Sequence, residues 1–471
     1  MPANNKQLLK LGDDNQFLEL TPNDNDPSLL VSGTDSSWIN NGESISVDQL
    51  RHRIEPWLTA LCQSEHLNLL IGSGLSTAIQ LSSTGAPPPG MGWVDDLAVL
   101  RSEIDRFVNE SAAKAGRSAG NIEDQIRAIN EAIRGLEILT VMRQAQPDNP
   151  PAPYAPYRNM ADELAQLKSE IRRVIKSFSS SICAGETAIK KAERESSLET
   201  FNYLVSFLMS FAGRSATKDR LHVFTTNYDR IIEVGAELAG LRLIDRFVGS
   251  IAPIFRSSRL EVDFHYNPPG IRGEPRYLEG VARFTKLHGS LDWFEHDGNI
   301  RRLGIPFGAK SIGPFLEAEG GDPETFEQLM IYPNSAKDRE TSEYPYVELF
   351  RDLAAASCRP NSTLVAYGYS FGDEHINRVI SDMLTVPSTH VVIIAFGDPL
   401  GRIKRFVEES GRSAQLTVLI GNHLGDLKIL VDHYLPKPAI DRTTIKMADL
   451  LKQRGLIQKE RTVEQPEGPG V

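Results

Sequence analysis

Residues 67–76 read Leu67-Asn68-Leu69-Leu70-Ile71-Gly72-Ser73-Gly74-Leu75-Ser76. An apolar run followed directly by two glycines predicts a buried strand, a tight turn and the start of a helix. Glycines at such a turn let backbone N–H groups approach an anion, and a helix N-terminus favours negative charge. Because Thr77 replaces the third glycine of a dinucleotide-binding fingerprint, the spacing is also typical of a turn that binds no ligand.

The same succession of apolar run and polar turn recurs along the chain. The residues that follow these runs are Gly72, Asn227, His288, Gly368, Gly397 and Gly421. Continuous apolar strands that alternate with helices indicate a parallel sheet covered by helices on both faces, which is a Rossmann-like α/β fold. Because such sheets bind ligands at the carboxyl ends of their strands, we expect these turns to converge on one site.

A large helical insertion is predicted from about residue 93 to about residue 213. Apolar residues within it recur at three- and four-residue steps, as in Leu164–Phe178, and the proline-rich segment 146–156 interrupts it. The insertion can pack on the sheet, cap the cleft or carry an oligomer contact. The preceding loop, 81–92, contains three consecutive prolines and can be a lid or an ordinary surface loop.

Both ends of the chain are polar. Residues 1–45 are rich in Asn, Asp, Ser and Gly, which predicts an N-terminal arm that is disordered or ordered only against a partner or neighbouring subunit. The sheet domain with its insertion then spans 46–435. Prolines at 436 and 438 mark a break, and we expect a C-terminal helix and a polar tail over 436–471.

Composition limits the classes of function. The chain has 471 residues and a net charge of -11, which disfavours direct binding of nucleic acid. Its apolar runs are too short to cross a bilayer and its N-terminus carries no apolar signal segment, so we expect a cytoplasmic protein that does not bind membranes. The three cysteines, Cys62, Cys183 and Cys358, are spaced too widely for a zinc ribbon, and we expect no metal.

Two polar side chains are the first candidates for chemistry. The amide of Asn227 can donate and accept at once, which suits holding a sugar hydroxyl or a water, although Asn227 or Asp229 can equally cap the next helix. Gly289 permits a sharp turn that projects the His288 imidazole into a cleft, where it can take a proton near neutral pH. A satisfied structural histidine is the alternative. A hairpin is predicted directly after it, over Trp293–Arg302.

Five motifs in order carry a resemblance to a known family. They are LLIGSGLS (69–76), FTTNYD (224–229), KLHGSLDW (286–293), GYSFGDEHIN (368–377) and AFGDP (395–399). This order resembles the sirtuin-like domain, in particular its bacterial branch found in antiphage defence. The resemblance covers about residues 65–425, interrupted by the helical insertion.

The resemblance implies a role for each motif. It makes Asn227 and His288 the catalytic residues, with His288 as the base, and places Asn227 and Asp229 at the nicotinamide ribose of NAD. The other NAD-binding residues that it implies are Gly72, Ser73, Gly74 and Ser76 at the phosphates, Thr226 beside Asn227, and Gly368, Ser370 and Gly397 along the adenosine half.

The departures from the family pattern favour hydrolysis of NAD. Protein-deacetylating sirtuins carry a four-cysteine zinc module, which three scattered cysteines cannot form, and Tyr228 stands where those enzymes have a smaller aliphatic residue. We therefore expect an NAD glycohydrolase that acts as an antiphage-defence effector by depleting NAD. The alternatives are a non-catalytic subunit that senses NAD or ADP-ribose, and a protein deacylase. The resemblance also implies a homo-oligomer and a HerA-type hexameric ATPase as partner.

Overall fold

The computed structural model describes residues 6–437, except 13, 15, 27, 90–91, 115–116, 118, 145–159, 215–217, 259–261, 267–275, 297 and 321–343. The proline-rich break predicted at 146–156 lies outside the described residues. The C-terminal helix and polar tail also lie outside them from residue 438 onward.

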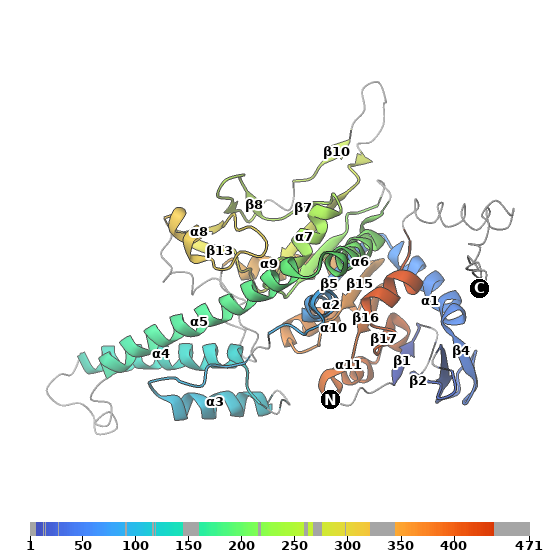
Figure 1. Ribbon diagram of the computed structural model, residues 1–471, viewed down its shortest axis with the longest axis horizontal. Helices are drawn as coiled ribbons and strands as arrows, with labels where there is room; N and C mark the ends of the chain where they lie inside the picture. The colour runs from blue at the N-terminus through green and yellow to red at the C-terminus, as the bar shows by residue number, and fades with distance from the viewer. Residues whose placement is uncertain are drawn as a thin grey trace, which may run out of the picture.

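A large sheet forms the centre of the described part of the chain (Figure 1). Its parallel strands lie in the order β17-β16-β15-β5-β6-β12-β7. In that order they span Leu416–Ile420, His390–Ala395, Ser362–Tyr367, His66–Ile71, His222–Thr225, Val281–Lys286 and Arg242–Ile244. The strands predicted from the apolar runs are thus confirmed.

Helices cover both faces of the sheet, because each central strand is apolar on both sides. In β15, Val365 and Tyr367 belong to one core cluster, whereas Leu364 and Ala366 belong to the other. The first cluster includes α1 (Val47–Cys62), α2 (Ser73–Thr84), α6 (Arg194–Ala212) and α7 (Ile231–Leu238). The second includes α9 (Tyr346–Ser357), α10 (Glu374–Met383) and α11 (Arg402–Ser410). The Rossmann-like α/β class is confirmed.

The N-terminal segment differs from the expectation of an arm. Its strands β1 (Gln7–Lys10), β2 (Leu18–Pro22), β3 (Leu29–Ser32) and β4 (Ser44–Ser46) form antiparallel pairs that extend the main sheet beyond β17. Leu9, Leu18 and Leu20 are buried there. Each strand is short and contributes few apolar residues, so the polar residues between them dominate the composition. For this segment the prediction of an arm is wrong.

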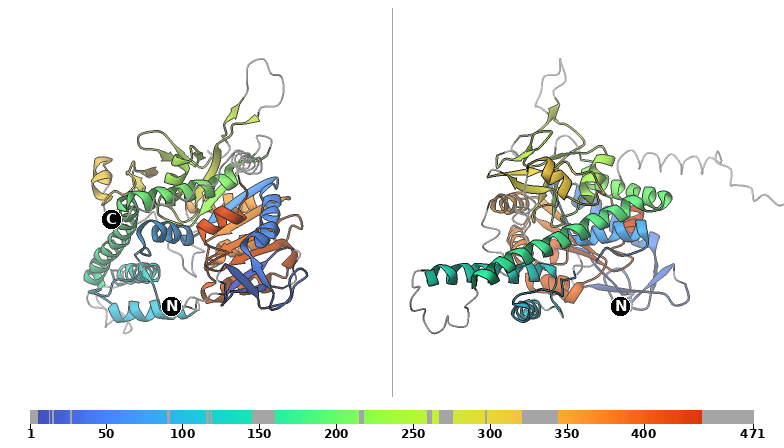
Figure 2. Two further views of the ribbon diagram at one scale, coloured as in Figure 1. Left: turned by 45° about the vertical axis from the view of Figure 1, so that its right-hand side comes forward. Right: turned by 60° about the vertical axis from the view of Figure 1, so that its left-hand side comes forward.

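The segment predicted as a helical insertion contains the helices α3 (Arg101–Lys114), α4 (Ile122–Gln144), α5 (Met160–Lys191) and α6. The predicted apolar stripe of α5 is buried, including Leu167, Ile171 and Phe178. Figures 1 and 2 show α3 and α4 lying to one side of the sheet, beside the N-terminal part of α5. The C-terminal part of α5 reaches the sheet domain, where α5 and α6 pack against α2.

A smaller antiparallel sheet combines two strands that precede β12 in the chain with two strands that follow it. It has the order β13-β14-β9-β8, with strands Trp293–His296, Asn299–Arg302, Ile254–Phe255 and Phe247–Val248. The hairpin predicted over Trp293–Arg302 is confirmed. The remaining elements are β10 (His265–Tyr266), β11 (Arg276–Tyr277), α8 (Gly313–Ala318) and α12 (Leu427–Ile429). Among the described residues, no helix combines the length and the apolar character that a membrane span needs.

Candidate functional site

The strand order places a topological switch point between β5 and β15. The chain proceeds from β5 to β6 and β12 on one side, and then returns to β15 on the other side of β5. Open α/β sheets bind their ligands at such a switch point, outside the carboxyl ends of the strands. The turns that follow β5, β6, β12, β15 and β16 carry the residues predicted for the site.

Glycines let the two turns at the switch point touch. A Cβ atom at Gly72 would lie 2.4 Å from the carbonyl oxygen of Gly368, and one at Gly74 would lie 2.6 Å from the Gly368 Cα. The N–H of Gly74 donates to the Gly368 carbonyl at 3.0 Å. Gly368 itself has a φ of +62°, which favours glycine. These glycines therefore let the backbones of the β5 and β15 turns pack directly against each other. Ser73, the first residue of α2, is exposed.

A chain of hydrogen bonds joins the β6 turn to α2. Asn227 Nδ2 donates to the carbonyl oxygen of Gly72 at 3.0 Å and to Ser76 Oγ at 2.9 Å. Ser76 Oγ in turn donates to Asp229 Oδ2 at 2.6 Å, and Asp229 Oδ1 accepts from the backbone N–H of Ile231 at 3.1 Å. The structure thus brings together four of the residues predicted for the site, and it also shows the helix-capping role of Asp229.

This network fixes the orientation of the Asn227 amide. Because the carbonyl oxygen of Gly72 can only accept, the atom that faces it must be the Asn227 nitrogen. Both amide hydrogens are then used inside the protein. Among the described residues, none donates to Asn227 Oδ1, so this oxygen can accept a hydrogen bond from a ligand hydroxyl or a water.

The His288 imidazole is paired with Asp373. The distance from His288 Nε2 to Asp373 Oδ2 is 2.9 Å, and both side chains are at least 96% buried. Asp373 is also the N-cap of α10, where its Oδ1 accepts from the backbone N–H groups of His375 and Ile376. An ionised Asp373 carboxylate can only accept, which assigns the imidazole hydrogen to Nε2 and leaves Nδ1, a buried atom, as the second ring nitrogen.

Two features of this pair were not predicted. The imidazole was expected to project into a cleft, but the His288 side chain is only 2% exposed because Asp373 and the surrounding turns enclose it. Asp373 was not singled out, although an Asp directly before a helix in the motif GYSFGDEHIN is a recognisable capping signal. Its contact with His288 spans 85 residues and could not be inferred from spacing.

The remaining predicted residues lie on the same edge of the sheet. Thr226 is half-buried after β6, whereas Ser370 and Gly397 are exposed after β15 and β16. Arg402, which the sequence analysis did not single out, lies beside the β15 turn. A Cβ atom at Gly372 would lie 2.8 Å from a guanidinium nitrogen of Arg402 and 3.4 Å from Ser370 Oγ. Burial and the neighbouring Arg117 lower the pKa of Arg402.

The carboxyl end of β17 is closed by the N-terminal strand. Gln7 Oε1 accepts from the backbone N–H of His423 at 2.9 Å and would lie 1.9 Å from a Cβ atom at Gly421. This turn is therefore filled by the protein itself. Within the described ranges, no group of three or more His, Cys, Asp or Glu side chains is placed to hold a metal ion.

Comparison with known families agrees with this arrangement. Residues 221–414 match the family model described as the SIR2-like domain. Over this range the chain is similar to the SIR2-like domain. Four of the five motifs lie inside the matched range, whereas LLIGSGLS precedes it. No curated protein matches the chain. SIR2-like proteins are NAD-dependent enzymes, so the match suggests NAD-dependent activity in general.

Proposed function

We propose that this protein is an NAD glycohydrolase that cleaves NAD to nicotinamide and ADP-ribose. The observation that carries the proposal is the pair of polar groups at the switch-point edge, namely Asn227 with an available carbonyl oxygen and His288 held by Asp373. Both follow parallel strands of the SIR2-like domain, β6 and β12, which are neighbours in the sheet.

The residues at this edge fit a dinucleotide. Ser73 is exposed at the N-terminus of α2, where the helix dipole favours a phosphate group. Arg402 supplies a positive charge on the far side of the β15 turn, beside the exposed Ser370. Asn227 and Asp229 follow β6, on the opposite side of β5 from the β15 turn, and the resemblance assigns their turn to the nicotinamide ribose.

Each polar group has a chemical task that its contacts favour. Asn227 Oδ1 accepts a hydrogen bond from a ribose hydroxyl or from the attacking water, because its amide is locked by Gly72 and Ser76. His288 accepts the proton at Nδ1, and the Asp373 carboxylate stabilises the imidazolium that results. The leaving nicotinamide departs as a neutral group, so no strong general acid is needed.

The packing of Tyr228 favours hydrolysis over deacylation. Tyr228 is 7% exposed, and its ring centroid lies 5.4 Å from that of Phe178 on α5 and 6.3 Å from that of His288. A large ring supported by α5 therefore fills space beside the imidazole. This supports a site for NAD and water, without a channel for an acyl-lysine side chain.

Release of nicotinamide from NAD tests the proposal. Asn227→Ala should remove turnover, whereas the matched control Asn202→Ala, at an exposed position on α6, should retain it. Binding of NAD to both variants, measured by calorimetry, separates catalysis from sensing. A folded Asn227→Ala protein with wild-type turnover contradicts the assigned role, and NAD binding without any release of nicotinamide favours a non-catalytic sensor.

The biological role that we propose is antiphage defence by depletion of NAD. Unrestrained hydrolysis of NAD would harm the cell that produces the protein. We therefore expect an oligomer that is inactive until a trigger or a partner, such as a HerA-type ATPase, opens the site. Mass photometry and turnover with and without that ATPase test both parts. A monomer that hydrolyses NAD at full rate without a partner would contradict them.

A further inference from the structure

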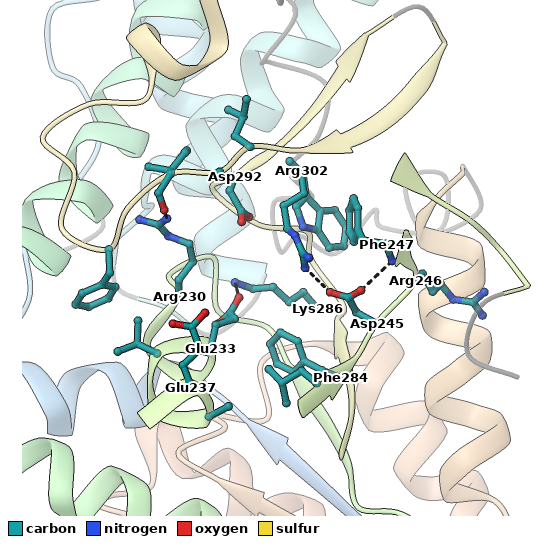
Figure 3. A pocket seen from close by; sticks show the side chains of 18 of the residues that line it. Arg230, Glu233, Glu237, Asp245, Arg246, Phe247, Phe284, Lys286, Asp292 and Arg302 are labelled. Atoms are coloured by element: carbon teal, nitrogen blue, oxygen red, sulfur yellow. Dashed lines mark hydrogen bonds and ion pairs between the residues drawn. The ribbon is translucent and has the colours of Figure 1, made fainter. Parts of the chain in front are cut away.

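A cavity lies beside α7, and Arg230 at the N-cap of that helix lines it. Its volume is about 570 Å³, and it is enclosed by α7, the strands β12 and β7, and the small sheet that contains β13 and β14 (Figure 3). Asn227, Ser76 and His288 do not line it. The cavity is therefore distinct from the proposed NAD site, although Lys286 on its wall donates to the carbonyl oxygen of Asp229 at 2.6 Å.

The cations on the cavity wall are already paired with carboxylates. Lys286 Nζ lies 2.8 Å from Glu233 Oε1, and Arg302 is paired with Asp245. The other two pair with carboxylates outside the lining, since Arg230 pairs with Glu186 and Arg246 pairs with Asp352. These ion pairs leave little uncompensated positive charge for an anionic ligand.

Two acids that line the cavity take no part in these pairs, and of these Asp292 is buried whereas Glu237 is exposed. Asp292 is 7% exposed, and among the described residues no group donates to its buried Oδ1. Figure 3 shows the carboxylate directed into the space between Arg230 and Arg302. The backbone fixes this position, because the Asp292 carbonyl accepts from the N–H of Leu303 at 2.7 Å.

The Asp292 carboxylate contributes to the raised pKa values of two neighbouring acids, Glu233 and Asp245. Burial, with a smaller contribution from the Asp292 carboxylate, raises the pKa of Glu233 to about 6 against the opposing effect of Lys286. Burial also raises the pKa of Asp245, and Asp292 adds to this effect. A buried carboxylate without hydrogen-bond donors is unfavourable, so the group that the cavity lacks is a donor with positive charge.

The apolar part of the wall is aromatic, with its rings inclined to one another by 57° to 83°. The ring centroids of Phe247 and Trp293 lie 5.0 Å apart, and Phe255 lies beside both. Phe284 lines the floor of the cavity from β12. Aromatic walls with a few convergent polar groups are typical of sites for small organic molecules.

We propose that this cavity binds a small organic cation, whose N–H groups donate to Asp292 and whose apolar part contacts the aromatic wall formed by Phe247 and Trp293. An amidinium or guanidinium group suits the site because two parallel N–H donors match both oxygens of a carboxylate. The inference is independent of NAD hydrolysis, since it is tested by binding alone.

Benzamidine and benzamide form a matched pair of probes, because they share a flat ring and differ in charge and in donors. Calorimetry with the full chain should show saturable binding of benzamidine and at least tenfold weaker binding of benzamide. Asp292→Asn should weaken benzamidine by about 10- to 100-fold, the range expected for losing a charged hydrogen bond. Glu237→Gln is the control, because Glu237 is an exposed acid that also lines the cavity.

A stability measurement separates loss of binding from loss of fold. Asp292→Asn removes a buried charge without hydrogen-bond donors, so its unfolding midpoint without ligand should equal or exceed that of the wild type. The proposal is overturned if benzamidine shows no saturable binding to the wild type at millimolar concentration. It is also overturned if benzamide binds equally well, or if Asp292→Asn retains the wild-type affinity.

Discussion

Replacing Asp373 by Asn separates its two roles, because Asp373 caps α10 and also holds His288. To keep the cap, the amide oxygen must face the N–H groups of His375 and Ile376, since those groups can only donate. The Asn nitrogen then faces His288 Nε2 and donates to it. This moves the imidazole hydrogen to Nδ1, so that His288 is held in the wrong tautomer.

The size of each effect follows from these contacts. Asn is as good an N-cap as Asp, so Asp373→Asn should cost no more than about 1 kcal/mol of stability. Asp373→Ala should cost about 2–4 kcal/mol, because it removes the cap and leaves a buried imidazole N–H without an acceptor. Turnover should fall by about 100- to 10,000-fold in both variants, which is the contribution of a positioned general base.

The assay is release of nicotinamide, under whichever condition the wild type turns over NAD, combined with denaturant unfolding of each variant. Asp373→Asn should behave as a folded protein with little activity, and the pH dependence of its residual rate should differ from that of the wild type. If Asp373→Asn is folded and retains more than half of the wild-type turnover, the pairing of Asp373 with His288 does not serve catalysis.

Three further outcomes are expected. Gly72→Ala should lower the free energy of unfolding by about 1–3 kcal/mol, since its Cβ would lie 2.4 Å from the carbonyl oxygen of Gly368. Gly397→Ala should be nearly neutral, because no neighbouring atom lies within 4 Å of its Cβ. Denaturant titration compares the two variants. The pKa of Glu233 is raised from 4.5 to about 6, so the folded state binds more protons than the unfolded state between these pH values. The stability of the wild type relative to Glu233→Gln should therefore rise as pH falls from 6 to 4.5. An equal difference in unfolding free energy between the two proteins at pH 7 and at pH 4.5 would contradict this. Extensive chelation should leave fold and turnover intact, and stoichiometric zinc in the purified protein would show that a metal site was missed.

The sheet was predictable from the sequence because its strands are buried on both faces. Runs such as Leu364–Tyr367 and Val391–Phe396 are continuously apolar, and that pattern with a polar turn at its end is typical of a parallel strand covered on both faces. The strands β1–β4 were missed because they lie at the antiparallel end of the sheet. Their few buried residues, such as Leu9 and Leu20, are separated by polar turns.

The candidate site was predictable in part. The topology rule brings strand ends together, which places Asn227 near Gly72 before any coordinates are known. It does not say which side chains touch. The contact of His288 with Asp373 joins the turns of β12 and β15, which are separated in the sheet by β5 and β6. The cavity beside Asp292 depends on the packing of α7 against the small sheet, and no local sequence pattern records that packing.

Hydrolysis of NAD in water enriched in oxygen-18 tests the central claim most directly. The wild type, with partner or trigger where these are required, should release nicotinamide and ADP-ribose in equal amounts, and the ADP-ribose should carry one oxygen-18 atom at the carbon that was bonded to nicotinamide. Asn227→Ala should release neither product. Bound NAD that remains intact, or release of nicotinamide only when an acylated lysine peptide is present, would contradict the claim.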